Sequence, residues 1–373
     1  MILGMSELTG MRMLIPSLRA AAAIALFAMA PACAQNAGLA RIPVHVVGRV
    51  AVDPDGSMRF GWPGVYFEGR FKGTGLNVVL ENGPDRLRLL IDGVERKRFE
   101  EAGASVDSRI EGLSDGEHSF RLEKLAETQG GFSRLIGFYP ISGARPLPAP
   151  QGKARQIEFI GDSWSVGWGN TAPGRTCTSQ DVHNTTDTQQ AYGSLVARRF
   201  DADYRINAFS GFGIARNYGG SSPGANLPAI YPRVIPSALV PLETSTGDWH
   251  PQIIVINLGT NDFSTPVHAG EAWPDDKALR TAYRARYIEF ARGVLVNKPG
   301  ARLILMGSDN FIADVDQVAT ALRETAPGRV STIHMPSLEL TGCDWHPSLK
   351  DDQHLADLVQ AEIGRIHPPA PWQ

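Results

Sequence analysis

The sequence carries little net charge and no long apolar stretch, and both absences narrow the class of protein. The formal net charge is −3, and no block rich in Lys or Arg gives the footprint of a nucleic-acid-binding protein. The apolar run near the N-terminus, Ala20 to Met29, falls short of the ~20 residues that a membrane-spanning helix needs. No internal repeat or low-complexity tract appears. We therefore expect no nucleic-acid partner and no transmembrane segment.

The composition that remains is that of a soluble globular protein. Apolar residues make up 43% and charged residues 20% of the 373-residue chain, which leaves room for a sizeable core. The length suggests two or three domains. The high counts of Gly (39) and Pro (26) indicate a part that is rich in loops or strands.

The N-terminus is predicted to be a signal peptide over residues 1–34. Arg12 and Arg19 flank the start of the apolar run, and small residues follow it up to Ala34, in the order of a secretory signal. Cleavage after Ala34 would place the mature chain in the periplasm or outside the cell. A lipoprotein signal at Cys33 is the alternative, although the three residues before it make a poor lipobox. The start methionine is Met1, Met11 or Met13.

The cysteines are considered for a chain that is exported from the cytoplasm. The chain has three cysteines, and removal of residues 1–34 leaves Cys177 and Cys343. An exported chain with two cysteines is expected to form one disulfide, which here would link the segments that follow Ser163 and precede His346. Two free, buried thiols are the alternative.

Residues 40–145 are predicted to form an all-β domain. Short apolar runs recur between turn signals such as Asp55-Gly56 and Asp92-Gly93, which is typical of a sandwich or jelly roll. The expected strands include residues 43–47, 65–71, 76–80, 86–91 and 118–122. Four aromatic residues are expected in the core of this domain, with a sugar-binding platform as the alternative: Trp62, Tyr66, Phe67 and Phe71.

A Pro-rich connector at 143–155 marks the domain boundary, with the extended linker at 146–155. Beyond it, residues 156–367 alternate short apolar strands with amphipathic helices, which implies a parallel sheet covered on both faces. The expected strands are 157–160, 204–209, 253–258, 302–306 and 330–334. The expected helices are 189–200, 279–296, 315–325 and 350–366. The long Gly-, Pro- and Ser-rich segment 214–249 is either functional or partly disordered.

Residues able to do chemistry gather at the ends of these strands. The first strand runs into Gly161-Asp162-Ser163, where a sharp turn places a serine at the carboxyl edge of the sheet, the edge at which open α/β folds bind ligands. The second and third strands run into Ser210-Gly211 and Asn261-Asp262, and Asp344-Trp345-His346 precedes the last helix. We expect these stretches to meet at one site.

These residue types suit hydrolysis by a serine nucleophile. The Ser163 hydroxyl needs a base to take its proton, and His346 titrates naturally near neutrality. Asp344 is the candidate acid that holds the imidazole tautomer. The backbone N–H groups of Ser163 and Gly211 and the side-chain amide of Asn261 are the candidate donors of an oxyanion hole.

The four stretches resemble, in order, the conserved blocks of the SGNH (GDSL) hydrolase superfamily. The resemblance implies a flavodoxin-like three-layer α/β/α fold and ester hydrolysis without a metal or a cofactor. It also implies Ser163 as the nucleophile, His346 as the base, and Gly211 with Asn261 in the oxyanion hole. In the second block Gly213 is the alternative to Gly211.

The last block departs from the pattern of that superfamily. Its acid usually lies three residues before the histidine, a position that Cys343 occupies here, and Asp344 lies two before His346. Asp351 and His354 have the usual spacing, but His354 would lie inside a helix. We therefore prefer His346, which is followed by a proline, a serine and then a helix, as in the superfamily.

The whole mature chain is similar to a narrower group, carbohydrate esterase family 2, whose acetyl esterases carry a jelly roll before the SGNH domain. The similarity rests on motifs such as Trp62-Pro63-Gly64-Val65-Tyr66-Phe67-Glu68 and Ile91-Asp92-Gly93, and on the spacing within residues 344–348. It implies removal of acetyl groups from plant polysaccharides such as xylan, with Trp345 lining the sugar site. Some members lack the acid and use a Ser–His pair.

The remaining polar candidates are interpreted as structural. Asp162 is expected to bond the turn that presents the serine, and Asp262 to act as a local cap or turn acid. A zinc site needs three or four converging ligands. His183, His250 and His268 have no clustered acids, so we expect them to be surface residues and expect no metal site.

The sequence thus predicts an exported serine esterase that removes O-acetyl groups from a carbohydrate through an acyl-enzyme. The expected partner is an acetylated carbohydrate. One alternative is an SGNH esterase or lipase acting on lipids or thioesters, but the sequence shows no continuous apolar helix that would form a lid. The other alternative is a catalytically vestigial carbohydrate-binding protein, against which the complete set of Ser163, Asn261 and His346 argues.

Overall fold

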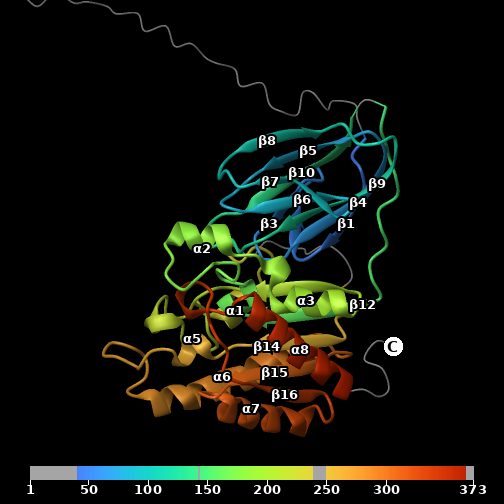
Figure 1. The fold of residues 1–373 in the computed structure, drawn as a ribbon. Coiled ribbons are helices and arrows are strands. Elements are labelled where there is room, and N and C mark those ends of the chain that lie inside the picture. Colours follow the sequence, from blue (N-terminus) through green and yellow to red (C-terminus); the bar gives the residue numbers. More distant parts are fainter. Residues whose placement is uncertain (1–39, 142, 238–248, 367–373) are drawn as a thin grey trace, which may run out of the picture.

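The computed structural model describes residues 40–141, 143–237 and 249–366, which form an all-β domain followed by an α/β domain (Figure 1). The strands of the first domain lie together at one end of the molecule, and the helices gather around the sheet at the other end. The predicted signal peptide, with Cys33 and the candidate start methionines, lies outside the described residues.

The first domain is built from two antiparallel sheets. One has the strand order β1 (Val44–Val47), β4 (Tyr66–Gly73), β9 (Gly116–Lys124), β6 (Leu87–Ile91) and β7 (Val94–Phe99), with β11 (Arg145–Pro146) also paired to β4. The other has the order β2 (Val50–Val52), β3 (Met58–Phe60), β10 (Ser133–Pro140), β5 (Leu76–Glu81) and β8 (Ser105–Ile110). The predicted β-sandwich is confirmed.

The four aromatic residues of this domain belong to its core. Trp62, Tyr66, Phe67 and Phe71 are each at most 1% exposed, so the sugar-platform alternative is wrong. Strands β7 and β8 escaped prediction because most of their side chains face solvent and carry no apolar alternation.

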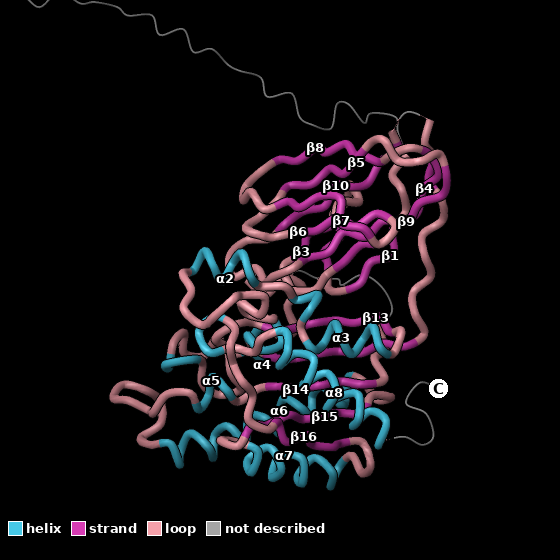
Figure 2. Tube along the Cα trace, in the orientation of Figure 1, coloured by secondary structure: helices cyan, strands magenta, loops and turns pink. Residues whose placement is uncertain are grey.

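The second domain contains a parallel five-stranded sheet. Its order is β13 (Ala202–Ala208), β12 (Arg155–Gly161), β14 (Ile253–Asn257), β15 (Arg302–Ser308) and β16 (Val330–Met335). In chain order this is 2-1-3-4-5, the flavodoxin-like arrangement. Two pairs of helices cover the two faces, as right-handed crossovers require (Figure 2): α3 (Tyr192–Arg199) with α8 (Leu349–Arg365), and α6 (Asp276–Asn297) with α7 (Ile312–Thr325).

All five predicted strands and four predicted helices of this domain are present, with ends that differ by a few residues. The predicted helix at 189–200 is divided into the 3₁₀ turn η2 (Thr188–Gln190) and α3. Short elements escaped prediction because three to seven residues are too few to show a helical period. They are α1 (Ser163–Val166), α2 (Ser179–Thr185), α4 (Leu227–Ile230), α5 (Thr260–Phe263) and the 3₁₀ turns η3 (Tyr218–Gly220) and η4 (Cys343–Trp345).

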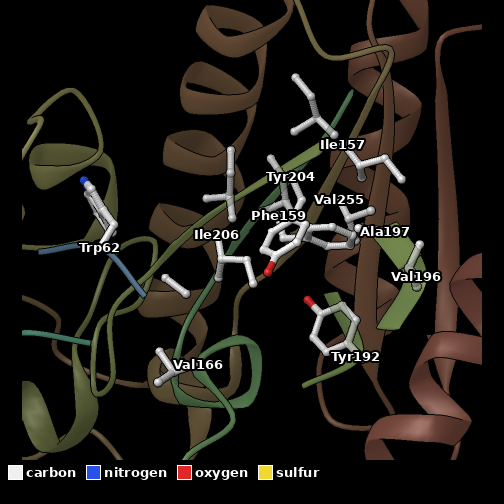
Figure 3. Close-up of a cluster of buried hydrophobic side chains, with 14 of the residues drawn as sticks. Trp62, Ile157, Phe159, Val166, Tyr192, Val196, Ala197, Tyr204, Ile206 and Val255 are labelled. Atoms are coloured by element: carbon white, nitrogen blue, oxygen red, sulfur yellow. The ribbon is translucent and has the colours of Figure 1, made fainter. Parts of the chain in front are cut away.

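The two domains pack directly against each other. Trp62 of the sandwich domain lies beside the apolar core of the α/β domain (Figure 3), and its indole N–H donates to the Arg233 carbonyl at 3.0 Å. The Asp203 carboxylate accepts from the Tyr66 hydroxyl at 3.0 Å and pairs with His45 at 2.9 Å. Buried polar contacts of this kind fix the orientation of the partners, because each broken one leaves an unsatisfied group.

Candidate active site

The serine of the first block stands where β12 ends and α1 begins. Asp162 is the N-cap of α1 and accepts the Trp164 N–H at 3.0 Å, which makes Ser163 the first residue of the helix. Gly161 is required here because a Cβ at this position would lie 2.0 Å from the Ser165 hydroxyl. Ser163 is 5% exposed, so its hydroxyl is held by the turn at the carboxyl edge of the sheet.

The structure brings His346 directly to Ser163. Its Nε2 lies 2.8 Å from the Ser163 hydroxyl, and its Nδ1 lies 2.9 Å from the Cys343 carbonyl and 3.1 Å from the Asp344 carbonyl. Because carbonyl oxygens only accept hydrogen bonds, Nδ1 carries the proton and Nε2 can accept one from the serine. The alternative, His354, is exposed on α8.

The protonation state of His346 suits this arrangement. Burial is the main influence and lowers the pKa of His346 below its usual 6.5, although the two backbone carbonyls act in the opposite direction. A lowered pKa means that the ring is neutral at pH 7. A neutral ring is the form that can take the proton of the serine.

Asp344 supports His346 through its main chain. Its carboxylate accepts from the Trp168 indole N–H at 3.4 Å, and within the described residues it makes no hydrogen bond to the imidazole. Asp344 and Trp345 have φ angles of 52° and 62°. This left-handed backbone turns both carbonyls of residues 343 and 344 toward the ring. The expectation that the Asp344 side chain holds the His346 tautomer is therefore not supported by any contact among the described residues.

We expect Asp344→Asn to lower kcat by less than about tenfold, because an exposed charge contributes at most about 1 kcal/mol. Asn is chosen because it tolerates a left-handed backbone. His346→Ala, measured on the same aryl acetate, should lose far more. Equal losses in the two variants would show that the carboxylate is needed.

The second block forms a tight turn beside the serine. Phe212 N–H donates to the Phe209 carbonyl at 3.2 Å, and Gly211, the third residue of the turn, has a φ of 82°, as a type II turn demands. No described atom lies within 4 Å of where a Cβ on Gly211 would be, so backbone conformation rather than crowding selects glycine there.

Two backbone donors at this edge have no acceptor within the described residues: the N–H groups of Ser163 and Gly211. Gly213 was the alternative in the second block, but its N–H donates to the Asn217 side chain at 3.1 Å. Free N–H groups are what an oxyanion hole needs, and Gly211 is therefore the better candidate.

The amide of Asn261 lies at the same edge but is already engaged. Its Nδ2 donates to the Asp162 carboxylate at 3.2 Å and to the Phe212 carbonyl at 3.0 Å. An amide nitrogen has two hydrogens, so Asn261 can serve an oxyanion only by exchanging or sharing one of these bonds. Burial raises the pKa of the Asp162 carboxyl to about 7.

Asp262 does more than the local capping expected of it. Its carboxylate accepts the backbone N–H groups of three residues that lie 46 to 48 positions earlier in the chain, at 2.7–3.0 Å: Ile214, Ala215 and Arg216. The prediction of a local cap or turn acid is therefore wrong. Asp262 ties the end of the third strand to the loop that carries Gly211.

The structure contains the Cys177–Cys343 disulfide. It ties the segment after α1 to η4, the turn whose carbonyl oxygens hold His346. The packing is close, because a Cβ on Gly169 would lie 2.3 Å from the Cβ of Cys343. The disulfide thus fixes the histidine loop against the serine segment.

The disulfide closes a loop of 166 residues, and cross-links of this kind typically contribute about 2–4 kcal/mol. Cys177→Ser should lower the free energy of unfolding in urea by that amount, and reductant should have no further effect on the variant. If reductant left the wild-type unfolding midpoint unchanged, the bridge would not contribute to stability.

Three aromatic residues lie on the segments that carry or border the candidate site. Trp345 is 64% exposed and stacks on the Arg175 guanidinium at 3.8 Å. The Trp168 ring lies 5.7 Å from the His346 ring. Tyr218, which was not among the predicted site residues, is 56% exposed, and its N–H donates to the Gly211 carbonyl at 2.9 Å. No periodic or motif signal distinguishes Tyr218 in the Gly-rich segment around it.

The other histidines do not join the site. His250 and His268 are exposed, and His183 is half-buried on α2. Across residues 40–141, 143–237 and 249–366 there is no group of three His, Cys, Asp or Glu side chains placed to hold a metal ion. No helix among these residues is long and apolar enough to cross a membrane.

Comparison with known proteins assigns both domains. Residues 46–150 match the family "Carbohydrate esterase 2 N-terminal", and residues 157–364 match "GDSL-like Lipase/Acylhydrolase". A protein of Cellvibrio japonicus named acetylxylan esterase / glucomannan deacetylase is 43% identical over 85% of this chain and 89% of its own length. The chain belongs to carbohydrate esterase family 2. It is accordingly a carboxylic ester hydrolase.

Other family members show how far the likeness extends. Cellulase/esterase CelE of Acetivibrio thermocellus is 31% identical over 83% of this chain, which spans 38% of the relative's length. A solved carbohydrate esterase has a TM-score of 0.81 and 39% identity, with 90% of this chain and 100% of that one covered. A family two carbohydrate esterase from Clostridium thermocellum in complex with cellohexaose has a TM-score of 0.75 and 27% identity, with 87% and 98% covered.

Proposed function

We propose that this family 2 esterase is exported and removes O-acetyl groups from a neutral polysaccharide through an acyl-enzyme on Ser163. The observation that carries the proposal is the 2.8 Å contact between the Ser163 hydroxyl and Nε2 of His346. It joins a nucleophile to a base whose tautomer is fixed by backbone carbonyls.

The reaction follows from this geometry. Ser163 Oγ attacks the acetyl carbonyl carbon while Nε2 of His346 takes the hydroxyl proton. The N–H groups of Ser163 and Gly211 receive the negative charge on the carbonyl oxygen, and Asn261 joins them by releasing the Phe212 carbonyl. The protonated His346 gives its proton to the departing sugar oxygen. His346 then takes a proton from a water molecule that attacks the acetyl carbonyl carbon, and it returns that proton to Ser163 Oγ as acetate leaves.

A sugar is the alcohol that fits the surroundings of the pair best. Trp345 precedes His346 in the chain, and Tyr218 is bonded to Gly211 through its N–H. Both residues are exposed, and amphipathic rings suit a sugar ring that has apolar faces and polar edges. A lipid ester would instead need a continuous apolar groove. The name of the Cellvibrio japonicus relative, acetylxylan esterase / glucomannan deacetylase, supports the same substrate class.

Two measurements test the substrate. Acetate release should be compared across acetylated xylan, glucomannan and peptidoglycan, and hydrolysis across 4-nitrophenyl esters of increasing acyl length. We expect release from one of the plant polysaccharides and a sharp preference for acetate. A preference for long acyl chains would favour the lipid-esterase alternative, and glycan binding without acetate release would favour a vestigial enzyme.

Export is tested separately by N-terminal sequencing of the protein recovered outside the cytoplasm. The proposal expects Gln35 as the first residue, which cleavage after Ala34 would leave. A diacylated Cys33 at the N-terminus would instead identify the lipoprotein alternative.

A further inference from the structure

The sandwich domain reaches into the esterase site through the loop between β9 and β10. Glu127, on this loop, accepts the backbone N–H of Ser210 at 2.7 Å with one carboxylate oxygen. The other oxygen accepts from the Gln129 amide at 2.9 Å. Ser210 is the residue immediately before Gly211, so an acid of one domain holds the candidate oxyanion turn of the other.

The loop that carries Glu127 is itself clamped between the domains. Leu125 N–H donates to the Arg86 carbonyl at 2.9 Å, and the Leu125 carbonyl accepts the Thr188 N–H of the α/β domain at 2.7 Å. Thr128 N–H donates to the Gly61 carbonyl at 3.1 Å. Backbone hydrogen bonds thus hold the chain on both sides of Glu127, so Glu127 is a fixed acceptor for the Ser210 N–H.

The turn has few other constraints on the side that faces the cleft. Among the described residues, its other backbone groups are bonded through Phe209 N–H to the Gly161 carbonyl at 3.1 Å, Phe212 N–H to the Phe209 carbonyl, and Tyr218 N–H to the Gly211 carbonyl. The Asn261 amide also donates to the Phe212 carbonyl at 3.0 Å. None of these bonds involves the peptide group between Ser210 and Gly211, which carries the candidate N–H donor. Glu127 also lines the interdomain cleft of about 410 Å³ that is bordered by Trp168 and Asp344, two residues that contact the His346 ring.

We propose that Glu127 is a positioning residue of the esterase site, supplied by the sandwich domain to fix the Gly211 donor through Ser210. The proposal rests on the oxyanion role of Gly211 proposed above. Gly211 belongs to the α/β domain, whereas Glu127 belongs to the sandwich domain. The sandwich domain would therefore help to position a group that acts in catalysis. An oxyanion donor acts only at the right distance from the developing charge.

The test compares Glu127→Ala and Glu127→Gln in the full-length enzyme with 4-nitrophenyl acetate. Loss of a whole oxyanion donor costs about 10²–10³ in turnover, and a displaced donor should cost part of that, so we expect kcat of Glu127→Ala to fall at least about tenfold. KM should stay within about twofold, because the donor acts on the transition state. Glu127→Gln keeps an oxygen that accepts the Ser210 N–H and should restore most of the turnover.

Two further variants make the result specific. Glu111→Ala removes an exposed acid of the same domain and should leave turnover unchanged. Ser210→Pro deletes the N–H that Glu127 accepts, at a turn position where proline is favoured. Both changes remove the same hydrogen bond, from the Ser210 N–H to the Glu127 carboxylate. The double variant should therefore lose no more kcat than the more damaged of the two single variants.

Several outcomes would overturn the proposal: kcat of Glu127→Ala within twofold of wild type, a change in KM alone, or an equal loss in Glu127→Gln. If Glu127→Ala does not fold, Glu127→Asp, which keeps the charge but withdraws the carboxylate by one methylene, takes its place and is expected to lose turnover. A wild-type enzyme that hydrolyses no ester would instead refute the proposed function.

Discussion

Ser163→Ala is expected to lower kcat on an aryl acetate by about 10⁴-fold or more, because loss of a serine nucleophile or its base removes the whole covalent route. His346→Ala should lose about as much, since the two groups act as a unit across their 2.8 Å contact. The two changes together should cost little more than either alone.

Matched controls separate this result from damage to the fold. Ser179→Ala changes an exposed serine at the start of α2, and His354→Ala changes an exposed histidine on α8. Both should retain near wild-type turnover. If His354→Ala were inactive and His346→Ala active, the choice of the base would be wrong.

Asn261→Ala is expected to lower kcat by about 10²–10³, the usual cost of removing one oxyanion donor. The loss should appear in kcat rather than KM if the amide leaves the Phe212 carbonyl only when negative charge develops on the substrate. Circular dichroism should show a folded protein, although the buried Asp162 loses its Asn261 partner.

Asn261→Asp sharpens the same test. It keeps the shape of the side chain but replaces the donor by a second carboxylate beside Asp162, and it should be at least as inactive as the alanine variant. Asn184→Ala, which changes an exposed asparagine on α2, serves as the control. Turnover of Asn261→Ala close to wild type would mean that the two backbone N–H groups suffice.

The fold of the α/β domain and most of the candidate site residues could be predicted from the sequence. Apolar strands and amphipathic helices predicted the parallel sheet. The ends of three strands predicted Ser163, Gly211 and Asn261 as site residues, and the stretch before the last helix predicted His346. This works because the carboxyl ends of neighbouring parallel strands must meet at one edge. The contact between Ser163 and His346 spans 183 positions, and the fold and the Cys177–Cys343 disulfide bring the two segments together.

What the sequence did not reveal depends on backbone direction and on distant partners. The left-handed φ angles of Asp344 and Trp345, which turn carbonyls toward His346, leave no mark in residue type, so the acid side chain was the natural candidate. Asp262 bonds a segment 46 to 48 residues away, a partner that only the folded chain shows. Glu127 belongs to a different domain from the turn it holds, so no motif of the hydrolase domain includes it.

The central claim is that Ser163 carries the acetyl group between substrate and water. Acid-quenched reaction mixtures with an acetylated substrate, digested and analysed by mass spectrometry, test it most directly. The account predicts one acetyl group on the peptide that contains Ser163 and none in Ser163→Ala. A fully active enzyme in which Ser163 is never acetylated, or in which the acetyl group is carried by another residue, would contradict it.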